Sequence, residues 1–348
     1  MADFERNFAQ RVGAEYAVAL NSCTAALHLA LLANGVGPGD EVLVPTLTFA
    51  ATAEVVLAVG AAPILVDCNA DDLTIDFAKV RESITPKTAA IMVMHYGGTA
   101  ADMHQAMAIK RDSPNIAIIE DAAHAFPTQH ELGMIGSIGD ATCFSFYANK
   151  TITTGEGGML TTDSEEIAHK VRQLSLHGLS RDAWARFETR SSWDYDIVEA
   201  GWKYNMTDAA ASLGLVQLSR ADDLADQRRA IAAQYNTALA DVAGITPRPQ
   251  GDLSKGASHL YVARVNREEF GIDRSELISR LADRDIGTSV HYRPLHMHSL
   301  YVEKFGFAPH DFPAASAAFD EIVSLPVFPG MTCEEVERVV DGIASASS

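Results

Sequence analysis

Short runs of apolar, often β-branched residues alternate with longer helix-like stretches through the first two-thirds of the chain. Helix-like segments such as TAALHLALLAN and TFAATAEVVLAVG separate these runs. Buried parallel strands read as near-continuous apolar runs, and each needs a long connection to the next, usually a helix. The alternation therefore predicts an α/β fold with a mostly parallel sheet covered on both faces, whose strands fall at AVAL (17–20), EVLVP (41–45), PILVD (63–67), AAIMVMH (89–95) and IAIIED (116–121).

Two more strands, ATCFSF at 141–146 and GGMLTT at 157–162, are predicted on either side of a turn rich in Thr and Gly. From Thr207 to about Val242 the pattern is helical, and no proline interrupts it before Pro247. A stretch of this length predicts a helix, straight or bent, that links two domains.

The order of elements changes after this linking helix. The pattern predicts a strand, a helix, a second strand and a terminal helix at HLYVARV (259–265), SELISRLADRD (275–285), TSVHYR (288–293) and EEVERVVDGIASA (334–346). A unit of roughly a hundred residues with this order is an α+β domain. We therefore predict a large domain over residues 1–240, which includes the linking helix, and a small C-terminal domain over residues 241–348.

The charge and composition are those of an acidic globular protein. The 348 residues are 47% hydrophobic and carry a formal net charge of -19, which argues against a nucleic acid or an anionic membrane as partner. No apolar run is long enough to span a bilayer, and the opening MADFERNFAQ has no apolar signal core. The cysteines lack CxxC or Cys/His spacing, so we expect no metal site, no disulfide framework and a cytoplasmic location.

The segment GDATCFSFYANKTITTGEGGMLTT contains the lysine of greatest chemical interest, Lys150. The turn that follows it contains Gly155, Gly157 and Gly158, which let the backbone pass close to a ligand. The neighbours of Lys150 are apolar or small, so the lysine side chain is expected to point inward. A desolvated lysine loses proton affinity and can attack an aldehyde. A lysine at a strand end is as often a solvated surface residue, and the spacing alone leaves both interpretations open.

A carboxylate ends the predicted strand IAIIED, at the edge of the sheet where α/β folds bind ligands. This residue, Asp121, could keep the nitrogen of a pyridine ring protonated, which makes the ring an electron sink, or it could cap the next helix. His124 follows at helical spacing. It could donate to a ring hydroxyl, or it could be a hydrogen-bonded histidine of the core.

The segment NSCTAALHLAL begins a helix with small and hydroxyl residues directly after a strand. Backbone N–H groups at a helix start, together with the positive end of the helix dipole, bind phosphate well. Ser145 places a further hydroxyl near Lys150 in the sequence. Serine and threonine at a helix start are more often simple caps, so this signal is weak when taken alone.

Seven segments taken in order point to a known family, namely NSCTAAL, TLTFAAT, EDAAHA, GDATCFSFYANKTITTGEGG, GWKYNMTDAAASLGLVQL, HYRPLH and SLPVFPGMT. They extend over nearly the whole chain, which resembles the DegT/DnrJ/EryC1/StrS family of sugar aminotransferases. The resemblance implies a pyridoxal-phosphate-dependent transferase of fold type I, with a large mixed, mostly parallel sheet domain and a smaller C-terminal α+β domain. It also implies a homodimer whose active sites lie at the subunit interface.

The same resemblance implies roles for individual residues. Lys150 would hold pyridoxal 5'-phosphate as an imine, Asp121 would pair with the pyridine nitrogen, and His124 would lie beside the ring hydroxyl. Phe49 looks like the aromatic residue that stacks on the ring. The positions that match the phosphate-binding and the substrate-side residues of the family are Cys23, Thr24 and Ser145, and His291 and Tyr292, respectively.

Three features depart from the common pattern of the family. Cys23 stands where many relatives have glycine, although a backbone amide can still serve there. Lys203 of GWKYNM replaces the asparagine that reaches the phosphate of the other subunit, and an ammonium group suits that role. The chain begins almost at Phe4-Glu5, so we expect part of the sugar pocket to be missing or built differently.

The resemblance implies transfer of an amino group from glutamate to a keto sugar. The segments HGLSRDAW and GWKYNMTD look most like the branch that aminates the C4 ketone of nucleotide-linked sugars, including the enzyme that makes UDP-4-amino-4-deoxy-L-arabinose for lipid A. The product would enter cell-surface polysaccharide, lipopolysaccharide or antibiotic sugar synthesis. Amination at C3, or of a keto sugar without a nucleotide, stays open.

Two other functions occur as alternatives to amino transfer on this fold. Sugar dehydratases of this family either replace the lysine with histidine or add an iron–sulfur cluster, and this chain has Lys150 and no clustered cysteines. A non-catalytic protein on the same fold would be expected to have lost Lys150 or Asp121, and both are present.

Overall fold

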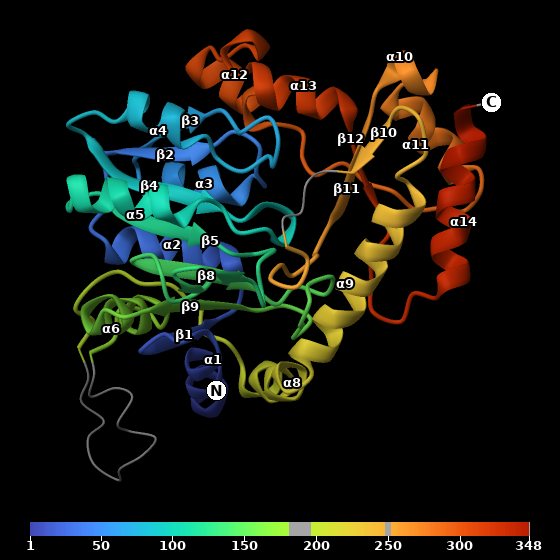
Figure 1. Ribbon diagram of the computed structural model, residues 1–348. Coiled ribbons are helices and arrows are strands. Elements are labelled where there is room, and N and C mark those ends of the chain that lie inside the picture. Colours follow the sequence, from blue (N-terminus) through green and yellow to red (C-terminus); the bar gives the residue numbers. More distant parts are fainter. Residues whose placement is uncertain (181–195, 248–251, 348) are drawn as a thin grey trace.

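The large sheet of the fold contains seven strands in the order β1-β9-β8-β5-β4-β2-β3 (Figure 1). The computed structural model describes residues 1–180, 196–247 and 252–347. Within them β9 runs antiparallel to both of its neighbours, and the remaining pairs of the sheet are parallel. The strands are β1 (Tyr16–Leu20), β2 (Glu41–Pro45), β3 (Ala62–Val66), β4 (Thr88–Met94), β5 (Ala117–Asp121), β8 (Ala141–Ser145) and β9 (Gly158–Thr162). The predicted mixed, mostly parallel sheet is confirmed.

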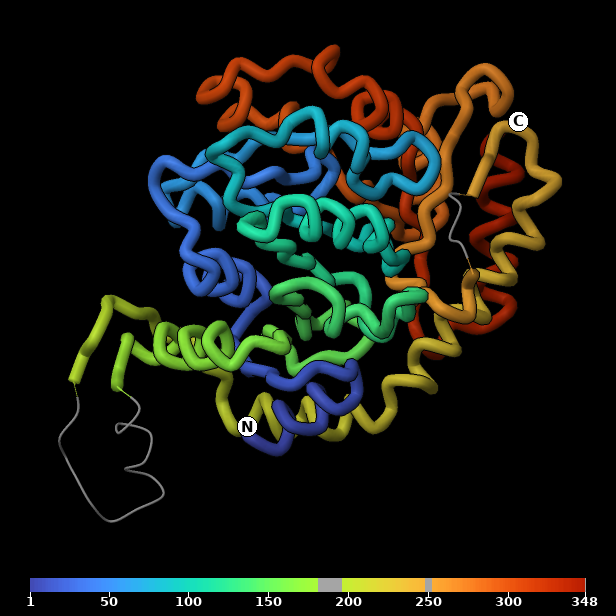
Figure 2. Tube along the Cα trace, turned by 60° about the vertical axis from the view of Figure 1, so that its left-hand side comes forward, coloured from blue at the N-terminus to red at the C-terminus, as the bar shows by residue number. Residues whose placement is uncertain are grey.

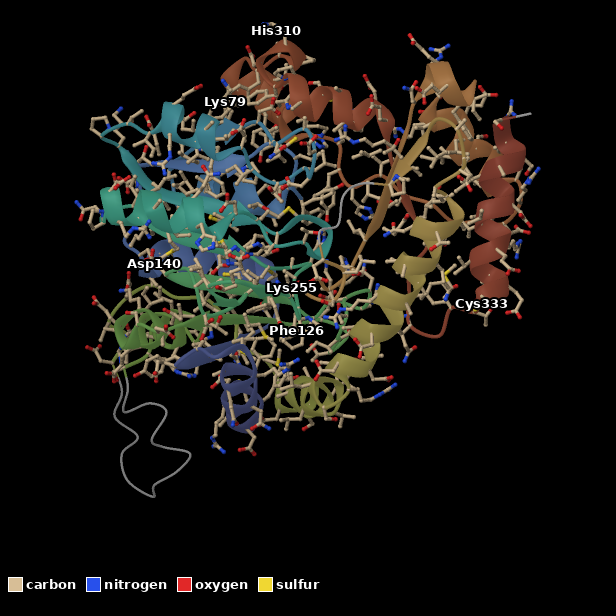
Figure 3. The ribbon with its side chains drawn as sticks, in the orientation of Figure 1. Lys79, Phe126, Asp140, Lys255, His310 and Cys333 are labelled. Atoms are coloured by element: carbon tan, nitrogen blue, oxygen red, sulfur yellow. The ribbon has the colours of Figure 1, made fainter. Side chains whose placement is uncertain are left out.

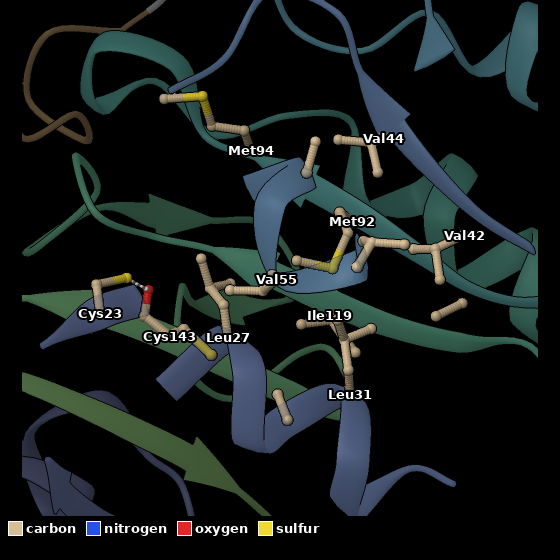
Figure 4. Close-up of a cluster of buried hydrophobic side chains, with 14 of the residues drawn as sticks. Cys23, Leu27, Leu31, Val42, Val44, Val55, Met92, Met94, Ile119 and Cys143 are labelled. Carbon is tan, nitrogen blue, oxygen red and sulfur yellow. Dashed lines mark hydrogen bonds between the residues drawn. The ribbon is translucent and has the colours of Figure 1, made fainter. Parts of the chain in front are cut away.

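Helices cover both faces of this sheet, because successive residues of a strand point to opposite sides. In β4, Ile91 and Val93 belong to one buried cluster, whereas Met92 and Met94 belong to the cluster on the other face, part of which Figure 4 shows. The first cluster is covered by α1 (Ala2–Val12), α4 (Phe77–Ser83), α5 (Met103–Asp112) and α8 (Asp208–Leu218), and the second by α2 (Cys23–Ala33), α3 (Ala51–Ala58) and α6 (Glu165–Leu174). In Figure 2, α1 lies beside α8 at the lower edge of the molecule.

A three-stranded antiparallel sheet forms a third core near the C-terminus. It consists of β10 (Ile245–Pro247), β11 (Tyr261–Val265) and β12 (Ile322–Leu325), with β11 in the middle. The third core also contains residues of α9 (Ala221–Ala238), α11 (Arg274–Ala282) and α14 (Cys333–Ala344). The helix α9 lies before residue 240, in the predicted large domain, yet it contributes to this C-terminal core. The domain boundary at residue 240 therefore stays a prediction. The other elements are β6 (Gln129–His130), β7 (Gly133–Met134), α10 (Arg267–Phe270), α12 (Ser299–Phe305) and α13 (Pro313–Glu321).

Two sequence-based expectations about elements need correction. The segment 288–293 is not a strand: only Ser289 pairs, through reciprocal backbone hydrogen bonds with Ser324. The linking helix predicted from Thr207 onward is two helices, α8 and α9, because Ser219 and Arg220 turn the chain between them. None of the helices in the described ranges is long and apolar enough to cross a membrane.

Buried residues of α12 and α13 belong to the cluster that contains Met92 and Met94, and α13 also contacts β11. Asp67 joins the start of α13 to the end of β3. The Asp67 carboxylate follows β3 and accepts hydrogen bonds from the backbone N–H groups of Ala314 and Ala315, each at 2.9 Å. These are two of the N–H groups that lack an intrahelical partner at the start of α13. The carboxylate therefore caps a helix that lies about 250 residues further along the chain.

Asp67→Ala should lower the free energy of unfolding by about 2 kcal/mol, because the N–H groups of Ala314, Ala315 and Cys68 lose their acceptor. Asp67→Asn keeps one acceptor oxygen and should cost less. Urea denaturation of the two variants measures both effects. Equal stability of wild type and Asp67→Ala would show that water replaces the cap without cost.

Candidate active site

A cavity of about 400 Å³ opens at the carboxyl ends of β4, β5 and β8, beside the start of α2. Ligands of open α/β sheets bind at this edge. The structure brings nine of the ten residues singled out from the sequence to its wall, and these are Cys23, Thr24, Phe49, Asp121, His124, Ser145, Lys150, His291 and Tyr292. The tenth, Lys203, is exposed and is not among the lining residues.

Lys150 lies in the turn after β8, where its backbone N–H donates to the carbonyl of Tyr147 at 3.0 Å. Its side chain points into the cavity, and Nζ lies 3.4 Å from Nε2 of His259. Burial lowers the pKa of the Lys150 ammonium to about 8, although Cys23 and Asp121 oppose the shift. An amine with this pKa is partly unprotonated near neutral pH and can act as a nucleophile.

This pKa gives a direct test of the environment of Lys150. Because only the unprotonated amine reacts, acetylation of Lys150 by acetic anhydride should rise with pH and reach half of its plateau near pH 8. Lys79, on the surface of α4 (Figure 3), is the internal reference, since its hydrogen bond with Glu82 raises the pKa above its ordinary value. Mass spectrometry of the two labelled peptides gives both profiles. Coincident profiles would mean that Lys150 is solvated.

Asp121 ends β5 and is 4% exposed. One carboxylate oxygen accepts from Thr52 Oγ1 at 2.7 Å and the other from the N–H of Ala123 at 3.1 Å. Burial raises the pKa of this carboxyl, and the two hydrogen bonds oppose the shift. Among the described residues, no cationic side chain forms an ion pair with Asp121. A cationic group bound in the cavity would therefore supply the positive charge that balances the carboxylate.

Three aromatic side chains surround the middle of the cavity. Nδ1 of His124 accepts from the N–H of Gly97 at 3.3 Å, which leaves Nε2 as the nitrogen that bears a proton, 2.9 Å from the hydroxyl of Tyr292. The rings of His124 and Tyr292 lie nearly parallel, with centroids 6.0 Å apart. Phe49, which is 56% exposed, lies 5.8 Å from Tyr292 between ring centroids, so one face of its ring is available to a planar ligand.

The other end of the cavity is formed by the start of α2. Ser22 caps this helix by accepting from the N–H of Ala25 at 3.1 Å, and the Cys23 thiol donates to the carbonyl of Cys143 (Figure 4). The backbone N–H groups at the start of the helix, together with Thr24, provide a site for an anion. Gly158 is required here, because a Cβ atom would lie 2.3 Å from the carbonyl carbon of Ser22.

His291 forms another part of the cavity wall. Its Nδ1 lies 2.9 Å from the hydroxyl of Ser324, and the Tyr96 hydroxyl donates to its backbone carbonyl. Burial and the nearby Lys150 lower the pKa of the His291 imidazole to about 4, so the ring is neutral at physiological pH. The side chain therefore offers hydrogen bonding rather than charge to a ligand.

The side chain of Lys203 does not line this cavity. Its Nζ donates to Oδ1 of Asn205 at 2.5 Å, and its backbone carbonyl accepts from the side-chain amide of Asn21. Within the part of the chain that the structure describes, Lys150 is the only lysine or arginine on the cavity wall. A phosphate-bearing ligand would therefore meet the backbone N–H groups at the start of α2 and Thr24 rather than a second cationic side chain of this wall.

Sequence reasoning missed three residues that support the site. Thr52 was visible in TFAAT at helical spacing from Phe49, and its hydroxyl holds Asp121. His259 stands at the start of the predicted strand HLYVARV, and Arg228 lies within the predicted linking helix, so neither has a signal of its own in the sequence. The contacts of both depend on chain segments that are remote in sequence, and no local pattern reports these.

The residues present fit pyridoxal phosphate on structural grounds. The buried carboxylate of Asp121 suits a protonated ring nitrogen, the Lys150 amine suits an aldehyde, and the helix start suits a phosphate group. The described residues contain no group of three or more His, Cys, Asp or Glu side chains arranged to hold a metal ion.

Comparison with known proteins gives matches over nearly the whole chain. The sequence model of the DegT/DnrJ/EryC1/StrS aminotransferase family matches residues 1–344. The "Spore coat polysaccharide biosynthesis protein SpsC" of Bacillus subtilis (strain 168) is 47% identical over 341 residues, which cover 98% of this chain and 87% of that protein.

Two solved structures show the same architecture. The "Putative sugar aminotransferase Spr1654 from Streptococcus pneumoniae, PMP-form" has a TM-score of 0.91 and 34% identity, and the match covers 99% of this chain and 91% of that one. The structure of DesI in the presence of its TDP-sugar product has a TM-score of 0.89 and 26% identity, with 99% of this chain and 84% of that one covered.

Proposed function

Because this chain belongs to the DegT/DnrJ/EryC1/StrS aminotransferase family, and is accordingly a pyridoxal-phosphate-dependent sugar aminotransferase, we propose that it moves an amino group from glutamate to the C4 ketone of a nucleotide-linked sugar. The observation that carries the amino-transfer chemistry of this proposal is the presence of Lys150 and Asp121 in one cavity, with pKa values that burial shifts in opposite directions. Pairs of titratable groups with environments of this kind mark acid–base sites.

Each lining residue has a proposed task in this reaction. Bound pyridoxal phosphate supplies an aldehyde carbon and an electron-withdrawing ring. Lys150 offers Nζ as the point of attachment and, once the amino donor has displaced it, carries a proton as base and then as acid. Asp121 keeps the ring nitrogen protonated. His124, with its proton on Nε2, and Phe49 orient the ring.

The acceptor and its fate are inferred from relatives and from sequence. DesI, which is similar to this chain, has been solved with a TDP-sugar product, which supports a nucleotide carrier here. The segment GWKYNMTD supports the C4 position by resemblance. The similarity to SpsC, which is described as a protein of spore coat polysaccharide biosynthesis, supports a polysaccharide as the destination of the amino sugar.

The acceptor is tested by converting the cofactor to its pyridoxamine form with glutamate and then adding keto sugars one at a time. The expected result is that nucleotide-linked C4-keto sugars restore the aldehyde spectrum, while C3-keto sugars and sugars without a nucleotide do so at least about 100-fold more slowly. A response confined to C3-keto compounds would contradict the C4 assignment. Loss of the keto sugar without uptake of nitrogen from glutamate would point to a dehydratase.

We also propose that the active enzyme is a homodimer in which the partner subunit's Lys203 completes the phosphate site. Two observations support this. The wall of the cavity has Lys150 as its only cation among the described residues. The outer side of α8 exposes Leu213 and Val216, at 44% and 59%, although the helix is apolar over most of its length. An uncovered apolar helix face of this kind marks an interface.

Val216→Glu should weaken dimerisation about 100-fold, because a two-fold interface meets each substitution twice and buries two unpaired charges. Sedimentation velocity over a concentration series measures the effect. The matched control is Val302→Glu on α12, at a valine that is 42% exposed, where no change is expected. A fully active monomer of the wild type would remove both the dimer and the role of Lys203.

A further inference from the structure

The side chain of His259 lies next to that of Lys150, and the proposed function gives it no role. It precedes β11 and is 5% exposed. Nε2 lies 3.4 Å from Nζ of Lys150, and the ring packs on His124 with centroids 4.4 Å apart. Nδ1 is buried without a hydrogen-bond partner in the described structure. The one polar contact of the ring is therefore the one with Lys150.

The imidazole of His259 is neutral. Burial is the main cause that lowers its pKa well below the ordinary value, and neighbouring cationic and titratable groups add to the shift. A neutral imidazole has one nitrogen that accepts a hydrogen bond and one that donates. When Lys150 is an ammonium, Nε2 can only accept from it. The groups that face this pair from the packed elements are Cys23 of α2, Asp121 of β5, Arg228 of α9, His124 and His291.

Arg228 fixes the backbone on both sides of this contact. Its guanidinium donates to the carbonyl of His259 at 3.4 Å and to the carbonyl of Asn149, which precedes Lys150, at 3.3 Å. A third bond, to the carbonyl of Val327, measures 2.8 Å. Arg228 is 4% exposed, and within the described ranges no carboxylate forms an ion pair with it. One buried cation thus ties the Lys150 turn to the start of β11.

We propose that His259 is a positioning residue that holds the amino group of Lys150 whenever that group is not bonded to the cofactor. Nε2 accepts a hydrogen bond from Nζ and keeps the amine beside the cavity between its two tasks, while Arg228 keeps the two backbones in register. His259 neither gives nor takes the transferred proton. The inference rests on the role of Lys150 in the proposed function, but not on the identity of the sugar.

Three substitutions of His259 distinguish the loss of the hydrogen-bond acceptor from the loss of the aromatic ring. His259→Phe keeps a ring against His124 and removes the acceptor. His259→Gln removes the ring but places an amide oxygen as many bonds from Cβ as Nε2 is. His259→Asn has the same amide one bond shorter and should not reach Lys150. His296→Gln is the control for loss of a buried histidine, since His296 contacts Thr46 and Ser316 rather than the cavity.

The first readout is acetylation of Lys150 against pH in the apoenzyme, which needs neither cofactor nor sugar. Because the hydrogen bond stabilises the ammonium, the midpoint should fall by about one pH unit in His259→Phe and His259→Asn and stay near the wild-type value in His259→Gln and His296→Gln. The second readout is the single-turnover reaction of the loaded enzyme with glutamate. Its rate should fall at least about 10-fold in the Phe and Asn variants, with the half-saturating glutamate concentration unchanged.

Unchanged midpoints in the Phe and Asn variants would overturn the proposal. So would a Gln variant as impaired as the Phe variant in both readouts, because ring packing would then be the cause. If His259→Phe does not fold, the Gln and Asn variants decide the question alone. A wrong acceptor sugar leaves the labelling result untouched, whereas failure of the wild-type chain to take up pyridoxal phosphate would count against the role of Lys150 itself.

Discussion

Lys150→Ala should reduce transamination by roughly 10⁴-fold or more, the largest effect expected of any single substitution in this protein. In the proposed mechanism the amine is both the attachment point for the cofactor and the carrier of the transferred proton, so its removal takes away two functions at once. The absorbance of covalently held cofactor should be lost as well. Steady-state assays and absorption spectra of the purified variant measure the two effects.

The matched control is Lys79→Ala, which removes an exposed lysine and its ion pair with Glu82. Exposed pairs of this type contribute little, and activity should equal that of the wild type. Substantial turnover by Lys150→Ala, with the spectrum of the wild type, would refute the assignment of the attachment site.

Asp121→Asn should lower the rate of the glutamate half-reaction by about 10³-fold, because a neutral amide does not hold a proton on the ring nitrogen. Cofactor uptake should persist, since Thr52 and Ala123 can still fix the side chain and Lys150 is intact. Stopped-flow spectroscopy of the first turnover measures the rate separately from binding.

Glu120→Gln is the control for this change, one residue earlier on β5. The Glu120 carboxylate faces away from the cavity and accepts from Thr142 and Gly139, at 2.7 Å each, while its other oxygen lies 2.9 Å from Nε2 of His95. Its substitution should cost stability, since a buried network loses one acceptor, but should leave the first turnover within about threefold. Equal kinetic losses in the two variants would mean that Asp121 acts through packing.

The strands of the large sheet could be predicted from sequence because their burial on both faces produces continuous apolar runs. β4 and β5 show this most clearly, with every residue of β5 buried. The segment 288–293 alternates polar residues with β-branched and aromatic ones, which also favours a strand, yet it forms only the bridge at Ser289. Tertiary contacts decide the path of this segment. Tyr292 contacts His124 and His291 contacts Ser324, and local propensity does not report these contacts.

The site was predictable where a residue type has an uncommon chemical use. Lys150, Asp121 and the start of α2 were each ambiguous alone, and their order along the chain resolved them. His259 and Arg228 gave no such signal, because buried histidines and helical arginines are common in ordinary cores. They matter because of contacts between remote parts of the chain. Arg228 donates to the carbonyl of Asn149, 79 residues away, and His259 contacts Lys150, 109 residues away.

The most direct test of the central claim follows the nitrogen atom itself. Glutamate labelled with ¹⁵N is incubated with the holoenzyme and a nucleotide-linked C4-keto sugar, and the product is examined by NMR for coupling between ¹⁵N and the sugar carbons. We expect the label on C4 of the sugar and a matching amount of 2-oxoglutarate. A sugar product without ¹⁵N, or with the label on C3, would contradict this assignment of function.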